Sequence, residues 1–172
     1  MAKSIADAVD ARLLLALAQN SRLTIVALAE RHGLSRNTVY ARLSKLEDTG
    51  ALGSIERRVD PGALGFPLTA YVLTTVKQRK LPQVEAALTE IAEVIEVQGL
   101  SGNVDLLIKV VGRDAADLYR IAGQILGIEG VKRTRMSLVI RQMVDHRIAP
   151  LLRKLANGDL SAVGASAGDQ VP

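Results

Sequence analysis

The chain has 172 residues, 48% hydrophobic and 23% charged, enough for one or two domains with filled cores. It contains no cysteine, which excludes disulfides, thiolate metal sites and cysteine nucleophiles, and its two histidines, His32 and His146, are far apart. No apolar run is long enough to span a membrane, and the N-terminus lacks the pattern of a secretory signal. We therefore expect a cytoplasmic protein with no metal, no cofactor and no catalytic residues.

The charge and the aromatic content restrict the kind of partner. A net charge of +4 permits binding to nucleic acid without requiring it. The aromatic residues are only Tyr40, Phe66, Tyr71 and Tyr119. Single-stranded nucleic acid is bound largely by stacking on aromatic side chains, and four scattered rings are too few for that. If the protein binds nucleic acid, a duplex is the better partner.

The first third of the chain has the pattern of three helices. Residues 7–19 space their apolar side chains as one helical stripe. A second helix is predicted over Thr24–His32, with Thr24 as N-cap and Gly33 as the residue that ends it. Ser35 then caps a third helix that runs to about Thr49. The last two helices, joined by a short turn with glycine, predict a helix-turn-helix.

The segment after Gly50 changes character. Residues 51–60 are predicted to form a short two-stranded wing, and Asp60-Pro61-Gly62 is a strong turn signal that marks a domain boundary.

The rest of the chain alternates strand and helix patterns. The strands are predicted at Leu68–Lys77, Val94–Ser101, Val104–Val111 and Val131–Val144, and the helices at Pro82–Ala92 and from Asp114 to about Leu126. This βαββαβ order predicts a ferredoxin-like sheet with two helices on one face. The other face has no helix to cover it, and if it is apolar it requires a partner copy.

These patterns predict an α+β chain in three parts. A winged helix-turn-helix takes residues 1–60, a ferredoxin-like domain takes residues 61–152, and a disordered tail, rich in small and polar residues, takes residues 153–172.

The third helix carries the side chains suited to reading a duplex. Its buried stripe is Val39, Leu43 and Leu46, whereas Asn37, Ala41 and Ser44 lie on the opposite side. A face with a small residue at its centre can enter a major groove, where asparagine and arginine suit the edges of adenine and guanine. The predicted DNA-contacting residues are Ser35, Arg36, Asn37, Thr38, Tyr40, Ala41, Arg42, Ser44, Lys45, Arg57 and Arg58. The alternative is a solvated helix with no nucleic-acid role.

Several motifs resemble the leucine-responsive regulator/AsnC (Lrp/AsnC, feast/famine) family of transcriptional regulators. In the first half these are LAERHGLS, RLSKLEDTG and DPGALG, and in the second half LSGNVDLLIKVVGRDAADLY and GIEGVKRTRMSLVIRQMVD. The resemblance runs from about Ala6 to Leu152. It departs where the family's common Pro-Thr-Pro is here Arg36-Asn37-Thr38, so the preferred DNA sequence does not carry over.

The resemblance implies three partners: duplex DNA, further copies of the chain in a homo-oligomer (a dimer, tetramer or octamer), and a small effector, often an amino acid, held by the second domain. The family's effector loop corresponds to Gly102, Asn103, Val104 and Asp105. A glycine turn can offer backbone N–H groups to a carboxylate, and Asp105 can pair with an ammonium group. Thr134 and Met136 are implied by position only. The plain alternative for Gly102–Asp105 is a hairpin turn.

Two other functions stay open from the sequence. Sirohaem decarboxylases share the two-part architecture, although His146 is the only histidine in the second domain. A ligand-free architectural DNA-binding protein is the other alternative.

Overall fold

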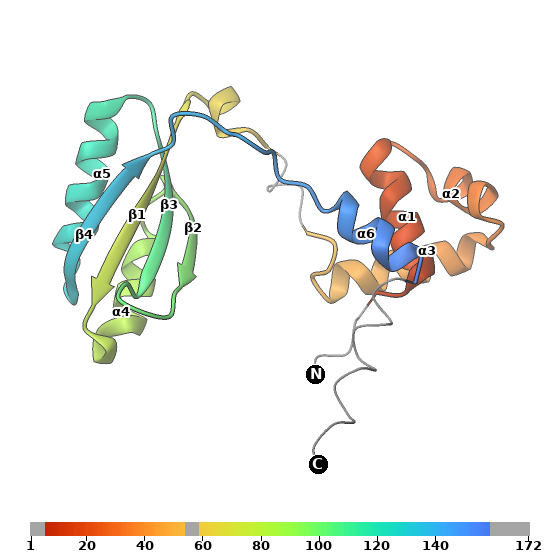
Figure 1. The fold of residues 1–172 in the computed structure, drawn as a ribbon, viewed down its shortest axis with the longest axis horizontal. Helices are drawn as coiled ribbons and strands as arrows, with labels where there is room; N and C mark the ends of the chain where they lie inside the picture. The colour runs from red at the N-terminus through yellow and green to blue at the C-terminus, as the bar shows by residue number, and fades with distance from the viewer. Residues whose placement is uncertain (1–5, 54–58, 159–172) are drawn as a thin grey trace, which may run out of the picture. The chain divides into compact units, whose positions relative to one another are not determined.

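A computed structural model describes residues 6–53 and 59–158, which divide into two compact units (Figure 1). Of the described residues, the first unit contains 6–53 and 145–158, and the second contains 59–144. Residues 54–58 of the predicted wing, which include Arg57 and Arg58, lie outside the described residues.

The first unit is helical. Helix α1 spans Ala8–Gln19, α2 spans Ile25–His32 and α3 spans Arg36–Asp48. Their shared core consists of Leu13, Ala16, Leu28, Ala29 and Val39. The predicted caps are confirmed: Thr24 and Ser35 begin α2 and α3, and Gly33 ends α2 in the left-handed conformation with φ 63°.

A fourth helix of this unit, α6, spans Ala149–Ala156 and packs against α1. This corrects the prediction that the second domain runs to 152 and that residues from 153 onward are disordered. Pro150 stands in the first turn of α6, where proline is tolerated, and the buried Leu152 supplies the apolar contact. The C-terminal segment therefore belongs, at least to Gly158, to the helical unit.

The second unit is a four-stranded antiparallel sheet with two helices on one face. After the short 3-10 helix η2 (Pro61–Leu64), its elements are β1 (Leu68–Val76), η3 (Gln78–Lys80), α4 (Leu81–Thr89), β2 (Val94–Gly99), β3 (Leu106–Gly112), α5 (Ala115–Gly127) and β4 (Val131–Leu138). The strand order is β2-β3-β1-β4. This is the predicted ferredoxin-like arrangement.

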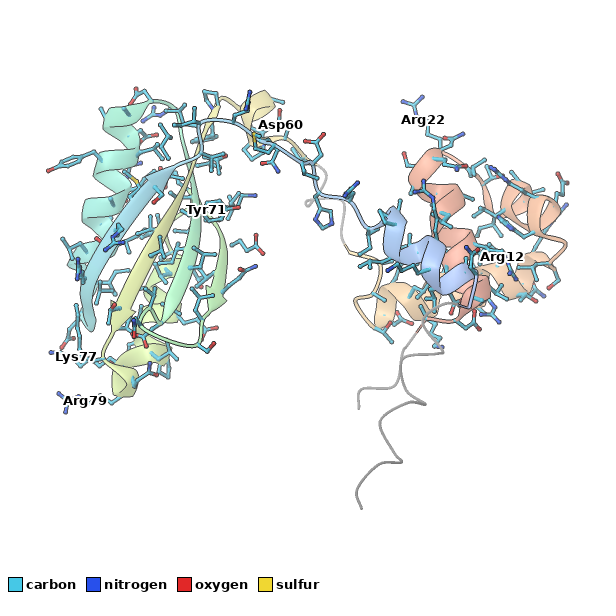
Figure 2. The ribbon with its side chains drawn as sticks, viewed as in Figure 1. Arg12, Arg22, Asp60, Tyr71, Lys77 and Arg79 are labelled. Carbon is cyan, nitrogen blue, oxygen red and sulfur yellow. The ribbon has the colours of Figure 1, made fainter. Side chains whose placement is uncertain are left out.

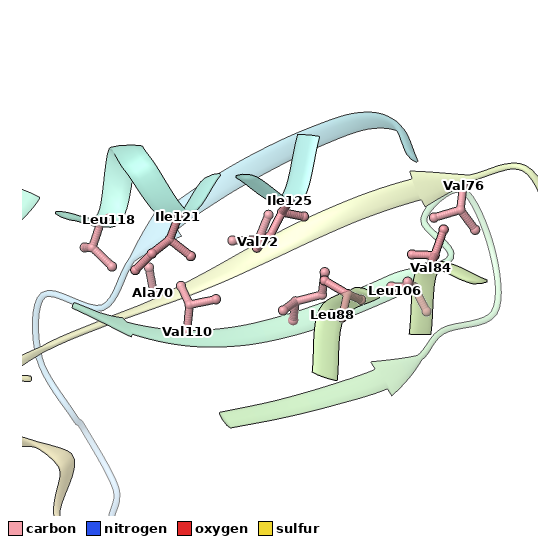
Figure 3. Packing of buried hydrophobic residues seen from close by; sticks show 11 residues of the cluster. Ala70, Val72, Val76, Val84, Leu88, Leu106, Val110, Leu118, Ile121 and Ile125 are labelled. Carbon is pink, nitrogen blue, oxygen red and sulfur yellow. The ribbon is translucent and has the colours of Figure 1, made fainter. Parts of the chain in front are cut away.

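The core of the sheet unit lies between the strands and both helices (Figure 3). Alternate residues of β1 and β3 point to the helices, because side chains along a strand alternate between faces. The buried cluster is Ala70, Val72, Val76, Val84, Leu88, Leu106, Ile108, Val110, Leu118, Ile121 and Ile125.

The face of the sheet that no helix covers is apolar only in part. Tyr71, Leu73 and Leu107 are half-buried near its middle, and Glu96 lies opposite Lys109 on the neighbouring strand. At the β4 side, Leu73 pairs with Arg135 and Thr75 with Arg133. This face therefore has an apolar centre with charges toward both edges.

The last strand is also shorter than predicted. β4 ends at Leu138 rather than at Val144. The N–H of Val139 still donates to the carbonyl of Thr69, but β1 begins at Leu68, so the following residues have no strand to pair with.

Candidate functional site

The turn between α2 and α3 is built from local hydrogen bonds. The Oγ of Ser35 accepts the N–H of Thr38 at 3.1 Å and lies 2.8 Å from the hydroxyl of Thr38. The N–H of Leu34 donates to the carbonyl of Ala29, which closes the end of α2 around Gly33. Ser35 and Thr38 are thus used in shaping the start of α3, as their residue types favour.

Helix α3 has one buried and one exposed side. Val39 and Leu46 are buried, and Leu43 packs against the core of the unit. The exposed residues are Arg36, Asn37, Tyr40, Ala41 and Lys45, together with the acidic Glu47 and Asp48 at the end of the helix. Tyr40 is 64% exposed although it is a large side chain. Five of the eleven predicted contact residues therefore lie on the exposed part of α3, away from the core.

Among the predicted DNA-contacting residues, Arg42 is engaged in an ion pair. Its Nη1 lies 2.8 Å from Oδ2 of Asp7 and 2.7 Å from Oδ1 of Asp10, at the N-terminus of α1. The side chain of Asp10 is 2% exposed, and the hydrogen bond from Arg42 is the main reason why the pKa of Asp7 falls below its ordinary value. Arg42 therefore holds α3 to α1, and the structure does not support a DNA contact by this side chain.

Ser44 lies at the margin of the exposed side. It is half-buried, and its hydroxyl donates to Oδ2 of Asp48 at 3.4 Å, a long hydrogen bond. The sequence predicted DNA contacts for Ser44 and Arg42 because helical spacing alone does not show which side chains form hydrogen bonds or ion pairs with other residues.

The predicted effector turn joins β2 to β3. Gly102 has φ 109°, a conformation that disfavours any side chain, and Ser101, Gly102 and Asn103 are all exposed. The N–H of Leu100 donates to the carbonyl of Asp105 at 2.8 Å and closes the turn. The hairpin interpretation is thus correct at least for the backbone.

Asp105 is tied to the end of β1. Its Oδ2 accepts the N–H of Val76 at 2.8 Å, and its Oδ1 accepts from Nε2 of Gln78 at 2.6 Å. Its own N–H donates to the carbonyl of Thr74 at 3.1 Å. An ionised carboxylate has about four acceptor positions, so these two bonds leave capacity for a further donor.

Thr134 and Met136 lie on the other side of β1 from Asp105. They pair with Thr74 and Val72 of β1, and on its other side β1 pairs with β3. The structure therefore does not bring them directly against the Gly102–Asp105 turn. The buried Thr74, which sequence reasoning missed, lies between Thr134 and Leu106, and its Oγ1 has no hydrogen-bond partner.

Within residues 6–53 and 59–158, no three metal-ligating side chains come together. In the same part of the chain, no helix has the length and apolarity needed to cross a membrane.

Comparisons with known proteins match both units. The family model described as an AsnC-type helix-turn-helix domain matches residues 7–47, and that described as an Lrp/AsnC ligand binding domain matches residues 69–149. A proline dehydrogenase transcriptional activator from Rhodobacter capsulatus is 33% identical over 149 residues, covering 85% of this chain and 97% of its own length. The chain belongs to the Lrp/AsnC family.

Other Lrp/AsnC proteins agree with this assignment. The transcriptional regulator FL11 from Pyrococcus furiosus is 25% identical, over 81% of this chain and 92% of its own. The structure of E. coli AsnC superposes with a TM-score of 0.74 at 25% identity, covering 84% of this chain and 99% of AsnC. A Neisseria meningitidis regulator, solved as a complex with L-Met, gives a TM-score of 0.71 at 25% identity, covering 84% of this chain and 95% of its own.

The Lrp/AsnC assignment decides between the functional classes. The protein is a transcriptional regulator with a ligand-binding domain, and the relatives it matches are regulators rather than sirohaem decarboxylases.

Proposed function

We propose that the exposed side of α3 reads the sequence of duplex DNA. The observation that carries this is the division of α3 into a buried side and an exposed side that presents Arg36, Asn37 and Ala41. Ala41 is small enough for the helix to approach base edges closely, and Asn37 and Arg36 can bind adenine and guanine. Arg57 and Arg58 are proposed to contact phosphates from the segment that follows, which would position the domain without specifying sequence.

DNA affinity is expected to fall steeply with salt. Each phosphate neutralised by a cationic side chain contributes about −0.9 to the slope of the logarithm of the binding constant against the logarithm of the salt concentration, because bound counterions are released.

Arg36→Ala or Asn37→Ala should cost about 1–3 kcal/mol of DNA-binding free energy and relax the base preference at one position. Arg57→Ala should weaken binding to all sequences alike. Fluorescence anisotropy at several salt concentrations measures both effects, and a binding constant that does not respond to salt would contradict the proposal.

We propose further that the sheet units associate through the uncovered face into a homodimer. The half-buried Tyr71, Leu73 and Leu107 supply the apolar centre, where a hollow of about 370 Å³ is lined partly by Tyr71 (labelled in Figure 2). Glu96 lies on β2 at one edge and Arg135 on β4 at the other. A two-fold axis parallel to the strands would place β2 over the partner's β4, bringing opposite charges together.

The dimer is tested by reversing these charges. Glu96→Lys should weaken the association, because it places two positive charges opposite each other. Adding Arg135→Glu should restore it, because opposite charges again face each other across the interface. Light scattering after size exclusion measures the mass. A stable monomer of the parent protein at micromolar concentration would overturn the proposed face.

The effector is proposed to be an amino acid or a related small carboxylate at the Gly102–Asp105 turn. The exposed turn offers backbone N–H groups, Asp105 keeps acceptor capacity, and the exposed Lys77 and Arg79 project at the end of β1 (Figure 2). The L-Met complex of the Neisseria meningitidis regulator supports this class of ligand. An effector can change DNA affinity only if it favours one assembly over another, and such coupling is about 1–3 kcal/mol.

Calorimetry with each of the twenty amino acids tests the effector site. We expect one or a few amino acids to bind the parent protein and none to bind Asp105→Asn. Gln78→Ala should still bind, because Gln78 only donates a hydrogen bond to Asp105 and its loss leaves the carboxylate charge in place. Equal binding by Asp105→Asn and the parent would show that the site is wrong. Silence in all twenty titrations would favour the ligand-free architectural alternative.

A further inference from the structure

Helix α6 belongs to a different unit from the strand that precedes it. The chain leaves the sheet unit at β4, which ends at Leu138, and α6 packs against α1 of the helical unit with Leu152 buried. Only Ala149, the first residue of α6, falls within the two regions that match family models. The α3 surface and the effector turn also lie elsewhere in the chain. None of these features therefore gives α6 a role.

The packing of α6 on α1 gives the helical unit a second covalent connection to the sheet unit. The first connection runs from the end of α3 to the start of β1, and the second runs from the end of β4 to α6. At the sheet, both connections leave from paired strands: Ala70 pairs with Leu138, and the N–H of Val139 donates to the carbonyl of Thr69 at 2.9 Å. A unit held at two points moves less freely than a unit held at one.

The second connection is the shorter of the two. Because Val139 is bonded to β1, residues 140–148 remain, and we call them the C-terminal tether; fully extended, they reach about 30 Å. In the first connection, the N–H of Leu52 donates to the carbonyl of Leu46, which leaves residues 53–67. These reach about 45 Å even if η2 keeps its fold, because a 3-10 helix rises about 2 Å per residue. While α6 is packed on α1, the C-terminal tether therefore sets the largest separation of the two units.

The length of the C-terminal tether can be changed without disturbing either unit. Residues 140–148 are exposed and belong to no helix or strand. Helix α6 is held by its own contact with α1, and the sheet unit has its own core. Exposed segments of this kind accept insertions at a small cost in stability. An insertion therefore removes the limit on separation and leaves both folds in place.

We propose that α6 anchors the C-terminal tether to the helical unit, and that the anchored tether determines which spacing of DNA half-sites a dimer binds. Half-sites of a dimeric regulator lie about 34–36 Å apart, or a multiple of this distance. Moving them apart by one helical turn requires about 17 Å from each of the two helical units. The second connection shortens the reach of each unit by about 15 Å, which is nearly the same distance. The consequence for DNA rests on the proposed α3 contact and the proposed dimer, whereas the tether itself rests on neither.

Distances measured by pulsed electron paramagnetic resonance test the tether without DNA. The chain has no cysteine, so Ala18→Cys on α1 and Ala86→Cys on α4, both at exposed positions, provide two unique sites for spin labels. Labelled chains are diluted with excess unlabelled chains, so that only distances within one chain are measured. A flexible Gly-Ser insertion of about twelve residues between Asp145 and His146 should at least double the width of the distance distribution.

The matched control carries the same insertion after Gly158, beyond α6 and outside the tether. It should keep the distribution of the parent. The comparison also tests the anchor, because an insertion before α6 has an effect only if α6 is held on α1. Equal widths for the two insertions would overturn the proposal.

The consequence for DNA is measured with duplexes that carry two half-sites at different spacings. The parent should bind best at one spacing and lose at least about ten-fold in affinity when the half-sites are moved apart by one helical turn. The chain with the lengthened tether should lose less than about three-fold, because its helical units reach farther. Both chains should bind a single half-site alike, since the insertion leaves α3 unchanged. Equal losses for the two chains would contradict the role of the tether, whereas a parent that binds no half-site would count against the α3 contact.

Discussion

The Arg42→Ala variant is expected to lose DNA binding because the helical unit is destabilised, not because a DNA contact is removed. Arg42 connects α3 to the carboxylates of Asp7 and Asp10. Asp10 is almost fully buried, and its Oδ2 also accepts the N–H of Asp7 at 3.0 Å in the capping box of α1. Removing the guanidinium leaves this carboxylate without its counter-charge, at a cost of about 2–4 kcal/mol in the free energy of unfolding.

Thermal unfolding followed by circular dichroism separates the two explanations. Arg36→Ala is the matched control, because Arg36 is an exposed arginine at the start of the same helix. It should keep the melting temperature of the parent and lose DNA affinity. If Arg42→Ala instead kept the parent's melting temperature while losing DNA affinity, Arg42 would be a DNA contact after all.

The same ion pair gives a dependence on pH with a defined sign. The pKa of Asp7 is lowered in the folded state, chiefly by its hydrogen bond from Arg42, so the interaction stabilises the fold at pH values above the ordinary pKa of 3.8. This stability is lost as the pH falls through the lowered value. The difference in melting temperature between the parent and Arg42→Ala should therefore narrow below about pH 4.

The Leu152→Ala variant is expected to destabilise the helical unit although its position is far from the helix-turn-helix in sequence. Leu152 is 8% exposed in α6, and α6 packs against α1. Truncation of a buried leucine to alanine typically costs about 2–5 kcal/mol, and the lower half of that range suits a residue in a short helix at the margin of the core.

Hydrogen exchange localises this effect. Amides of α1 should exchange faster in Leu152→Ala, while those of β1 and β3 should keep their protection, because the sheet unit has its own core. Leu151→Ala is the matched control, since Leu151 is 53% exposed in the same helix. Indistinguishable exchange in the two variants would show that α6 does not support α1.

The parts of the fold that depend on local chemistry were predicted from the sequence. Thr24, Gly33 and Ser35 mark helix ends through hydrogen bonds within three or four residues and through a left-handed turn, so their positions follow from residue type. The ferredoxin-like order of elements could be predicted because the apolar spacing within each segment indicates whether it is a strand or a helix.

The partners of Arg42 and Asp105 could not be predicted in this way. Arg42 meets residues 32 and 35 positions earlier in the chain, and Asp105 meets residues 27 and 29 positions earlier. Nothing in the neighbouring sequence reports such distant contacts. The end of β4 at Leu138 depends likewise on where β1 begins. Helix α6 is as short as α2 but has no side-chain cap that would mark its start in the sequence.

If the exposed side of α3 reads DNA, negative charges placed on that side should prevent binding. Asn37→Glu with Ala41→Glu places two acids on that side, whereas Ala18→Glu with Ser21→Glu adds the same charge at exposed positions in and just after α1. The measurement is the affinity of each variant for a duplex carrying a site found by genomic footprinting. We expect the affinity to fall at least about 100-fold for the α3 variant and only slightly for the α1 variant. Equal losses in the two variants, or undiminished binding by the α3 variant, would contradict it.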